Sequence, residues 1–284
     1  MQIDIEGIPG AIASEEGLPQ LCVDPVVAWL VEHVPDAEQD AAWRFGVVQW
    51  VGLLSQALGE PYRVLESDRV VLLSAESDRQ AGLLLHTATE SFRRVARFLG
   101  SSALTDWATV LAFDRQDRYY DYISAFYPDG EFPASAGCCV SQGLPHVVIA
   151  PCSDLLQLET IAAHELSHTL VYAFDLPVWL NEGLAVVTES GLSEYYSEPQ
   201  ELRACWQEFG LDTFWTGESF NVLDDRGRLS YDLAYLLVRA LLAHDQGAFA
   251  SLLQNADPKD GGFAACRNAY GVDPGTLAQR FLSE

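Results

Sequence analysis

The chain has 284 residues, of which 49% are hydrophobic and 20% are charged. This composition is that of a globular protein with a sizeable core, and it excludes a disordered chain. The formal net charge is −25, and Lys259 is the single lysine among 16 basic residues. Because phosphates would repel such an acidic protein, we expect neither nucleic acid nor an anionic membrane as a partner.

The N-terminal part of the chain is predicted to be helical. Residues 1–20 contain three glycines and two prolines and are expected to form an irregular lead-in. Helices are predicted to begin at Asp24 and at Asp36, and apolar residues at helical spacing continue the second helix to Leu58. We therefore assign residues 1–64 to an N-terminal helical extension.

Strands are predicted only in the middle of the chain. Three apolar runs of strand length occur at 69–75, 107–113 and 146–150, and a long helix is expected at 77–99 between the first two. After the second strand a short helix is expected to begin at Asp114. Residues 128–145, rich in glycine and proline, are expected to form a loop with one short strand at most.

From Ser153 onward the apolar period is helical throughout. Strands that precede a long helical part predict the α+β class rather than alternating strands and helices. We expect a domain at 65–284, with an α/β lobe containing a small mixed sheet at 65–190 and a mainly helical lobe at 191–284.

The chain is expected to be cytoplasmic and to have no membrane partner. Its first residues lack the basic start and apolar run of a signal peptide, and no apolar stretch is long enough to span a bilayer. The six cysteines contain no Cys-x-x-Cys pair and are predicted to be reduced thiols. Cys138, Cys139 and Cys152 are too irregularly spaced to predict a second metal site.

The segment His164-Glu165-Leu166-Ser167-His168 carries the strongest chemical signal. Histidines at i and i+4 project from one face of a helix, where both imidazoles can reach a single metal ion. The carboxylate of Glu165 lies beside this pair and can take a proton from a metal-bound water without being a ligand. The surrounding helix is apolar, so these polar groups need a functional reason to be there.

A second helix is predicted to supply the third ligand. It begins in the segment Pro-Val-Trp-Leu-Asn-Glu-Gly-Leu-Ala at 177–185, in which Glu182 follows His168 by 14 residues. A turn at 175–177 lets this helix fold back and present Glu182 to the same metal. Two histidines, one glutamate and a water form a catalytic zinc site with an open position, so we expect one Zn²⁺ per chain.

Together the two segments resemble the gluzincin metallopeptidases, in particular the peptidase MA-like domain proteins. The resemblance is strong at 160–186 and looser over 65–284. In that family a segment Pro-x-Trp-Leu-x-Glu-Gly-Leu-Ala follows the zinc helix and contributes the third ligand. The resemblance implies a thermolysin-like zincin fold and a zinc metallopeptidase, in which Glu165 activates a zinc-bound water to hydrolyse peptide or protein substrates.

Two further site residues are implied by the resemblance. Related domains often have a tyrosine at the position of Tyr231, which makes it our candidate for stabilising the oxyanion. In this fold class the strand before the zinc helix is an edge strand that pairs with substrate, so His146 at its start is a candidate for substrate binding. Two alternatives remain open. Tyr231 can simply pack against other side chains, and His146 can be a solvated residue at the end of its strand.

Glu189 is a candidate for a residue that orients a metal ligand without binding the metal itself. It lies seven residues after Glu182, on the same helical face, and can orient His164. Val186 stands where thermolysin-type enzymes have an aspartate, so the usual supporting carboxylate is missing. A solvated glutamate near the helix end is the alternative. The aromatic residues from Tyr119 to Tyr127 are assigned to packing.

Two other functions stay open. The protein can be a catalytically silent, zinc-containing relative that binds peptide or protein partners, or a helical interaction protein in which the motif is a coincidence. A metzincin is excluded, because Val171 and Phe174 stand where that class needs glycine and histidine.

Overall fold

The computed structural model describes residues 3–15, 17–100, 106–127, 136–190 and 199–283. The described chain combines a small mixed sheet with a majority of helix, which confirms the predicted α+β class. It divides into two compact units, Met1–Thr89 with Trp107–Thr169 and Glu90–Asp106 with Leu170–Glu284. None of the described helices is long and apolar enough to cross a membrane.

This division differs from the boundaries expected at 64/65 and 190/191. The N-terminal segment shares one core with the sheet, because side chains of the long N-terminal helix and of the strands pack together in a single cluster. The helix that carries Glu182 belongs to the second unit.

The N-terminal segment of the first unit contains a β-hairpin in addition to helices. Strands β1 (Ile12–Glu15) and β2 (Leu18–Leu21) pair antiparallel, so the expected irregular lead-in is wrong there. Gly17 has φ +82°, a conformation that glycine adopts at low cost in the turn between them. Helices α1 (Val23–His33) and α2 (Asp36–Leu58) follow as predicted. The indole N–H of Trp50 donates to the carbonyl of Pro19 at 2.9 Å and ties the hairpin to α2.

The first unit is built on a five-stranded sheet. Its order is β3-β4-β5-β7-β6, with β4, β5 and β7 parallel and both outer strands antiparallel to their neighbours. The three predicted strands are confirmed, and two short outer strands join them. The strands are β3 (Arg63–Glu66), β4 (Val70–Ser74), β5 (Ala108–Ala112), β6 (Gly137–Val140) and β7 (His146–Ile149).

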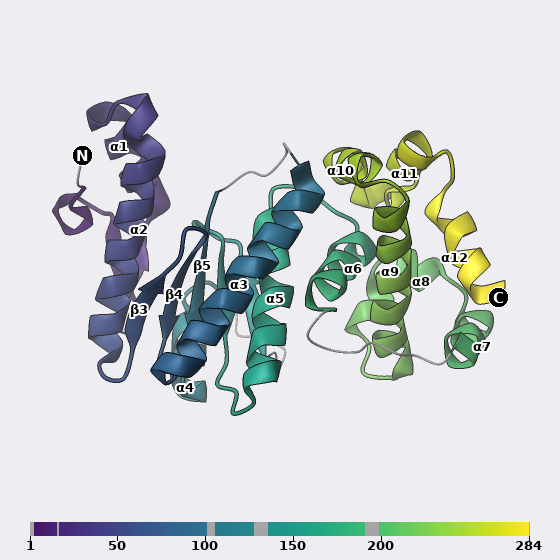
Figure 1. Cartoon of the computed structure of the whole chain (residues 1–284), viewed down its shortest axis with the longest axis horizontal. Helices are drawn as coiled ribbons and strands as arrows, with labels where there is room; N and C mark the ends of the chain where they lie inside the picture. Colours follow the sequence, from purple (N-terminus) through teal and green to yellow (C-terminus); the bar gives the residue numbers. More distant parts are fainter. Residues whose placement is uncertain (1–2, 16, 101–105, 128–135, 191–198, 284) are drawn as a thin grey trace. The chain divides into compact units, whose positions relative to one another are not determined.

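Helices cover both faces of this sheet. Helix α2 lies on one side, and α3 (Asp78–Leu99) and α5 (Leu155–Val171) lie on the other (Figure 1). The short helix α4 (Gln116–Ser124) adds Tyr119 and Tyr122 to the core on the α2 side. Because both faces are covered, every residue of β4, β5 and β7 is buried, as expected for the parallel part of a sheet.

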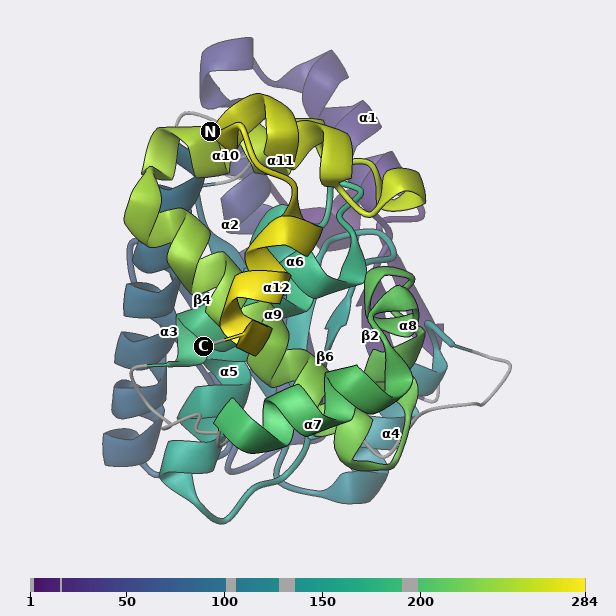
Figure 2. The same ribbon diagram turned by 90° about the vertical axis from the view of Figure 1, so that its right-hand side faces the viewer.

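The second unit is helical, as predicted for the C-terminal part. Helix α9 (Asp225–His244) packs on α6 (Val178–Glu189), and the remaining helices surround α9 (Figure 2). These are α7 (Pro199–Phe209), α8 (Asp212–Trp215), α10 (Gln246–Asn255), α11 (Phe263–Tyr270) and α12 (Pro274–Ser283), with short 3₁₀ turns at Glu218–Asn221 and Pro258–Asp260.

Helix α6 is held by close contacts within this unit. A Cβ atom at Gly183 would lie 2.6 Å from both the carbonyl oxygen of Ala234 and Cγ2 of Val238 on α9. The indole N–H of Trp179 donates to the carbonyl of Gly261 at 2.9 Å. The guanidinium of Arg94 donates to the carbonyl of Thr188 at 2.9 Å, at the end of α6 where carbonyls lack helical partners.

We predict that Gly183→Ala destabilises the protein by about 1–3 kcal/mol, because the added methyl meets backbone that cannot move aside. The matched control is Gly52→Ala in α2, where a Cβ would meet nothing within 4 Å. This control should raise stability by about 0.5–1 kcal/mol through helix propensity. Urea unfolding followed by circular dichroism measures both, and equal stabilisation by the two alanines would contradict the packing described for α6.

Candidate metal centre

The C-terminal half of α5 exposes one strip of polar side chains. His164, Glu165 and His168 are each partly exposed, whereas most residues between and around them are buried. The two imidazole rings have their centroids 5.0 Å apart and their planes at 76°. This arrangement follows directly from the i, i+4 spacing, which stacks both side chains on one helical face.

Helix α6 carries the third predicted ligand, Glu182. Six residues separate it from the end of α5, and its first turn is closed by the Leu180 amide, which donates to the carbonyl of Pro177 at 3.0 Å. One donor atom from each of His164, His168 and Glu182 can be chosen so that all three lie within 4.8 Å of one another. No other such group of histidine, cysteine and acidic side chains is found in the part of the chain that the structure describes.

The three donors fit the requirements of Zn²⁺. Imidazole nitrogen and carboxylate oxygen are both common zinc ligands, with bond lengths of about 2.0–2.2 Å. A tetrahedral site with such bonds places its ligand atoms about 3.3 Å apart. The separations of at most 4.8 Å exceed this distance by no more than about 1.5 Å.

Glu165 lies against the outer strand of the sheet. A Cβ atom at Gly137 of β6 would be 3.3 Å from Cγ of Glu165 and 2.6 Å from Cγ2 of Ile161. The strand can therefore lie close to α5 only because position 137 has no side chain. Two residues further along, Sγ of Cys139 lies 3.3 Å from Oγ1 of Thr169, so the strand follows the helix past Glu165.

Tyr127 is a candidate that the sequence did not single out. It lies just beyond α4 and is 36% exposed. Partial burial raises the pKa of its phenol, and the charges of Cys138, Cys139 and Glu165 raise it further. The phenol is therefore close enough to Glu165 to sense its carboxylate. No sequence feature separates it from the buried Tyr119 and Tyr122 of the same run.

Tyr231 lies near the start of α9, where its ring packs edge-on against Phe220 at a centroid distance of 5.2 Å. It precedes Ala234 by three residues, and the carbonyl of Ala234 is the atom that faces Gly183, next to Glu182. Residues three apart share a helical face, so Tyr231 lies on the side of α9 that faces α6. Its role at the oxyanion stays a prediction.

Glu189 is the last residue of α6 and is only 3% exposed, so the alternative of a solvated carboxylate is wrong. Two helical turns separate it from Glu182, which places the two residues about 10 Å apart along the axis. Its predicted role in orienting His164 stays a prediction.

His146 is enclosed by the core of the first unit. Its strand β7 lies between β5 and β6, so the expectation that it is the edge strand is wrong, and among the described strands β6 holds that place. The ring is 2% exposed: Nδ1 lies 2.7 Å from the carbonyl oxygen of Leu144, and Nε2 lies 2.8 Å from the hydroxyl of Tyr122. A neutral ring that donates from Nδ1 and accepts at Nε2 satisfies both contacts. The alternative that His146 is a solvated residue at the end of its strand is therefore wrong as well.

Neither a protein-family model nor a curated protein matches this chain.

The burial of His146 predicts a loss of stability in weak acid. Burial lowers its pKa from 6.5 to about 4, so between these values the unfolded chain binds a proton that the folded protein excludes. The free energy of unfolding should therefore fall by about 2 kcal/mol between pH 7 and pH 5 through this group alone. His146→Gln, which keeps a donor and an acceptor, should remove this part of the pH dependence. Urea unfolding at pH 7 and pH 5 measures the free energy of unfolding of both proteins. An equal loss of stability between the two pH values in the wild type and in His146→Gln would contradict the role given to His146.

Proposed function

We propose that the protein is a zinc-dependent metallopeptidase of the gluzincin type, with a thermolysin-like zincin fold. The observation that carries the proposal is the convergence of His164, His168 and Glu182, with donor atoms within 4.8 Å of one another, beside Glu165 on the same helix. The resemblance to the peptidase MA-like proteins in the two helical segments supports it.

The proposed chemistry divides between the metal and the chain. When bound, Zn²⁺ supplies a Lewis acid that polarises the scissile carbonyl and makes water a better nucleophile at neutral pH. His164, His168 and Glu182 would hold the ion. The Glu165 carboxylate accepts the proton of the attacking water and then delivers it to the leaving amine, as a general base and then a general acid.

The outer strand β6 offers a place for the substrate backbone. Among the described strands it is the outermost one on its side of the sheet, where an extended peptide could add a strand, and Gly137 keeps it close to Glu165. The developing negative charge on the carbonyl oxygen needs a hydrogen-bond donor. We assign that part to Tyr231, and Tyr127 is the second candidate because burial and then the charges of Cys138, Cys139 and Glu165 raise the pKa of its phenol.

Replacing Glu165 tests the proposal. Glu165→Gln keeps the size of the side chain and removes the base, so kcat on a mixed peptide library should fall by about 10²–10⁴-fold. Bound zinc should remain at the wild-type level, because Glu165 is not a ligand. The matched control is Glu159→Gln on the same helix, whose carboxylate accepts from the Thr87 hydroxyl and whose replacement should leave activity unchanged.

Two results would contradict the proposal. If the zinc-loaded wild-type protein cleaves no member of the library but still binds peptides, the protein is a silent zinc-containing relative. If Glu165→Gln retains full activity, the hydrolysis takes place elsewhere.

A further inference from the structure

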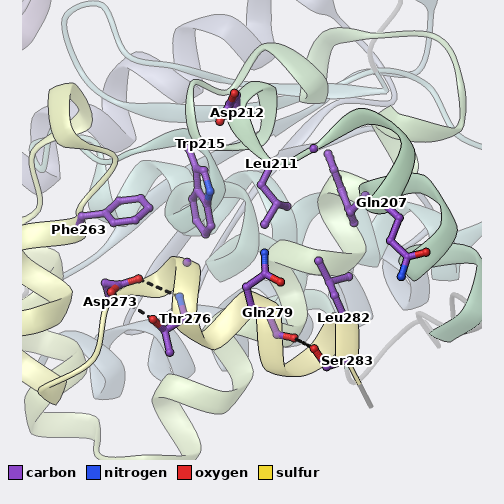
Figure 3. Close-up of a pocket in the computed structure, with 13 residues that line it drawn as sticks. Gln207, Leu211, Asp212, Trp215, Phe263, Asp273, Thr276, Gln279, Leu282 and Ser283 are labelled. Carbon is purple, nitrogen blue, oxygen red and sulfur yellow. Dashed lines mark hydrogen bonds between the residues drawn. The ribbon is translucent and has the colours of Figure 1, made fainter.

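The second unit contains a pocket with a volume of about 660 Å³. It lies among α7, α8, α11 and α12, and Figure 3 shows the residues that line it. The volume is in the range of small-molecule sites, about 300–1,000 Å³. All lining residues belong to one unit of the chain, and none of them is a candidate metal ligand.

Two aromatic rings form an apolar corner in this pocket. Trp215 and Phe263 meet edge to face, with centroids 5.0 Å apart and planes at 79°, and both are partly exposed. Both rings point into the same space in Figure 3. The apolar face of a ligand can pack on one of these rings while its edge meets the other.

Gly275 lets the polar start of α12 approach this corner. A Cβ atom at Gly275 would lie 3.2 Å from Oδ1 of Asp273 and 3.3 Å from Cε1 of Phe263. The carboxylate and the ring therefore flank the same small space, which stays open because position 275 has no side chain. The amide of Gly275 belongs to the first turn of α12, where amides have no helical acceptor, and adds a donor at this place.

Two side chains of this region keep hydrogen-bonding capacity for a ligand. Asp273 accepts from the amide and the hydroxyl of Thr276 at 2.8 and 3.2 Å, drawn as dashed lines in Figure 3, and each of its oxygens can accept a second donor. The side-chain amide of Gln279 points toward Trp215 and Leu211 in Figure 3 and forms no hydrogen bond with any described residue. Donors and acceptors therefore lie next to the apolar corner.

The pocket does not select a strongly charged ligand. No basic residue is among the described residues that line it, so an anion would gain no ion pair. The two acidic lining residues, Asp212 and Asp273, stand at the starts of α8 and α12, where the positive end of a helix dipole offsets part of their charge. A purely apolar ligand would cover Asp273 and Gln279 without giving them partners. A neutral ligand with an apolar face and a polar rim fits best.

We propose that this pocket binds a neutral pyranose saccharide. A pyranose with equatorial hydroxyls presents C–H groups on its faces, which pack on Trp215, and hydroxyls around its rim. Each hydroxyl both donates and accepts, so the rim donates to Asp273 and forms hydrogen bonds with the amides of Gly275 and Gln279. A planar base would pack on the rings equally well, but its donors and acceptors are fixed in one plane and would satisfy fewer of these groups. The site goes beyond the proposed peptidase and requires no metal.

Binding of cellotriose to the full chain tests this proposal, because its β-linked glucose rings carry only equatorial substituents. The indole ¹⁵N–¹H resonance of Trp215, assigned with Trp215→Phe, should shift and saturate as the sugar is added. The dissociation constant should be the same at low and high salt, because the ligand has no charge to be screened.

Two variants locate the sugar in the pocket. Gln279→Ala removes one hydrogen-bonding amide and should weaken binding by about 2- to 10-fold. Gly275→Leu fills the space between Asp273 and Phe263 and should weaken binding at least about tenfold. The matched control is Arg280→Ala, which changes an exposed residue of α12 outside the described lining and should leave binding unchanged.

Three outcomes would overturn the proposal. They are no shift of the Trp215 resonance up to the solubility of cellotriose, an equal effect of Gln279→Ala and Arg280→Ala on binding, or tighter binding of adenosine or spermidine than of cellotriose at the same resonance. The titration is run on Glu165→Gln protein treated with a chelator. Because it involves neither hydrolysis nor metal, its failure leaves the proposed peptidase untouched, and failure of the peptidase leaves this site untouched.

Discussion

The close packing of α6 on α9 is the constraint on which the candidate metal centre depends. Gly183 has no side chain because the backbone of Ala234 occupies the space where a Cβ would lie. Glu182 is the preceding residue, so the contact that fixes Gly183 also fixes the backbone that presents the glutamate. Adjacent residues on a helix point about 100° apart, which allows one to pack on α9 and the other to point away from that contact.

The local parts of the site were predictable from sequence because they depend on helical spacing. His164, Glu165 and His168 have their relation fixed by one helix, and Glu182 follows after a short turn and less than two turns of the next helix. The strands β4, β5 and β7 were predictable for a similar reason, since burial on both faces requires continuous apolar runs.

The features that were not predicted depend on contacts between distant segments. A single sequence does not encode such contacts in a local pattern. β6 reads Gly-Cys-Cys-Val and gains its place by pairing with β7, so the edge of the sheet was assigned to the wrong strand. His146 became a core residue because Tyr122 and Trp50 close over it from other elements. The pocket of the second unit joins residues separated by more than 70 positions, from Trp206 to Leu282.

Metal content measured by native mass spectrometry tests whether His164, His168 and Glu182 bind one zinc ion. Protein purified without an affinity metal should carry about one Zn²⁺ per chain, and Glu182→Ala should lose it or bind it at least about tenfold more weakly. Glu208→Ala, which removes an exposed carboxylate from α7, should retain the metal. A wild-type protein that takes up no zinc even when zinc is added would show that these three residues form no zinc site.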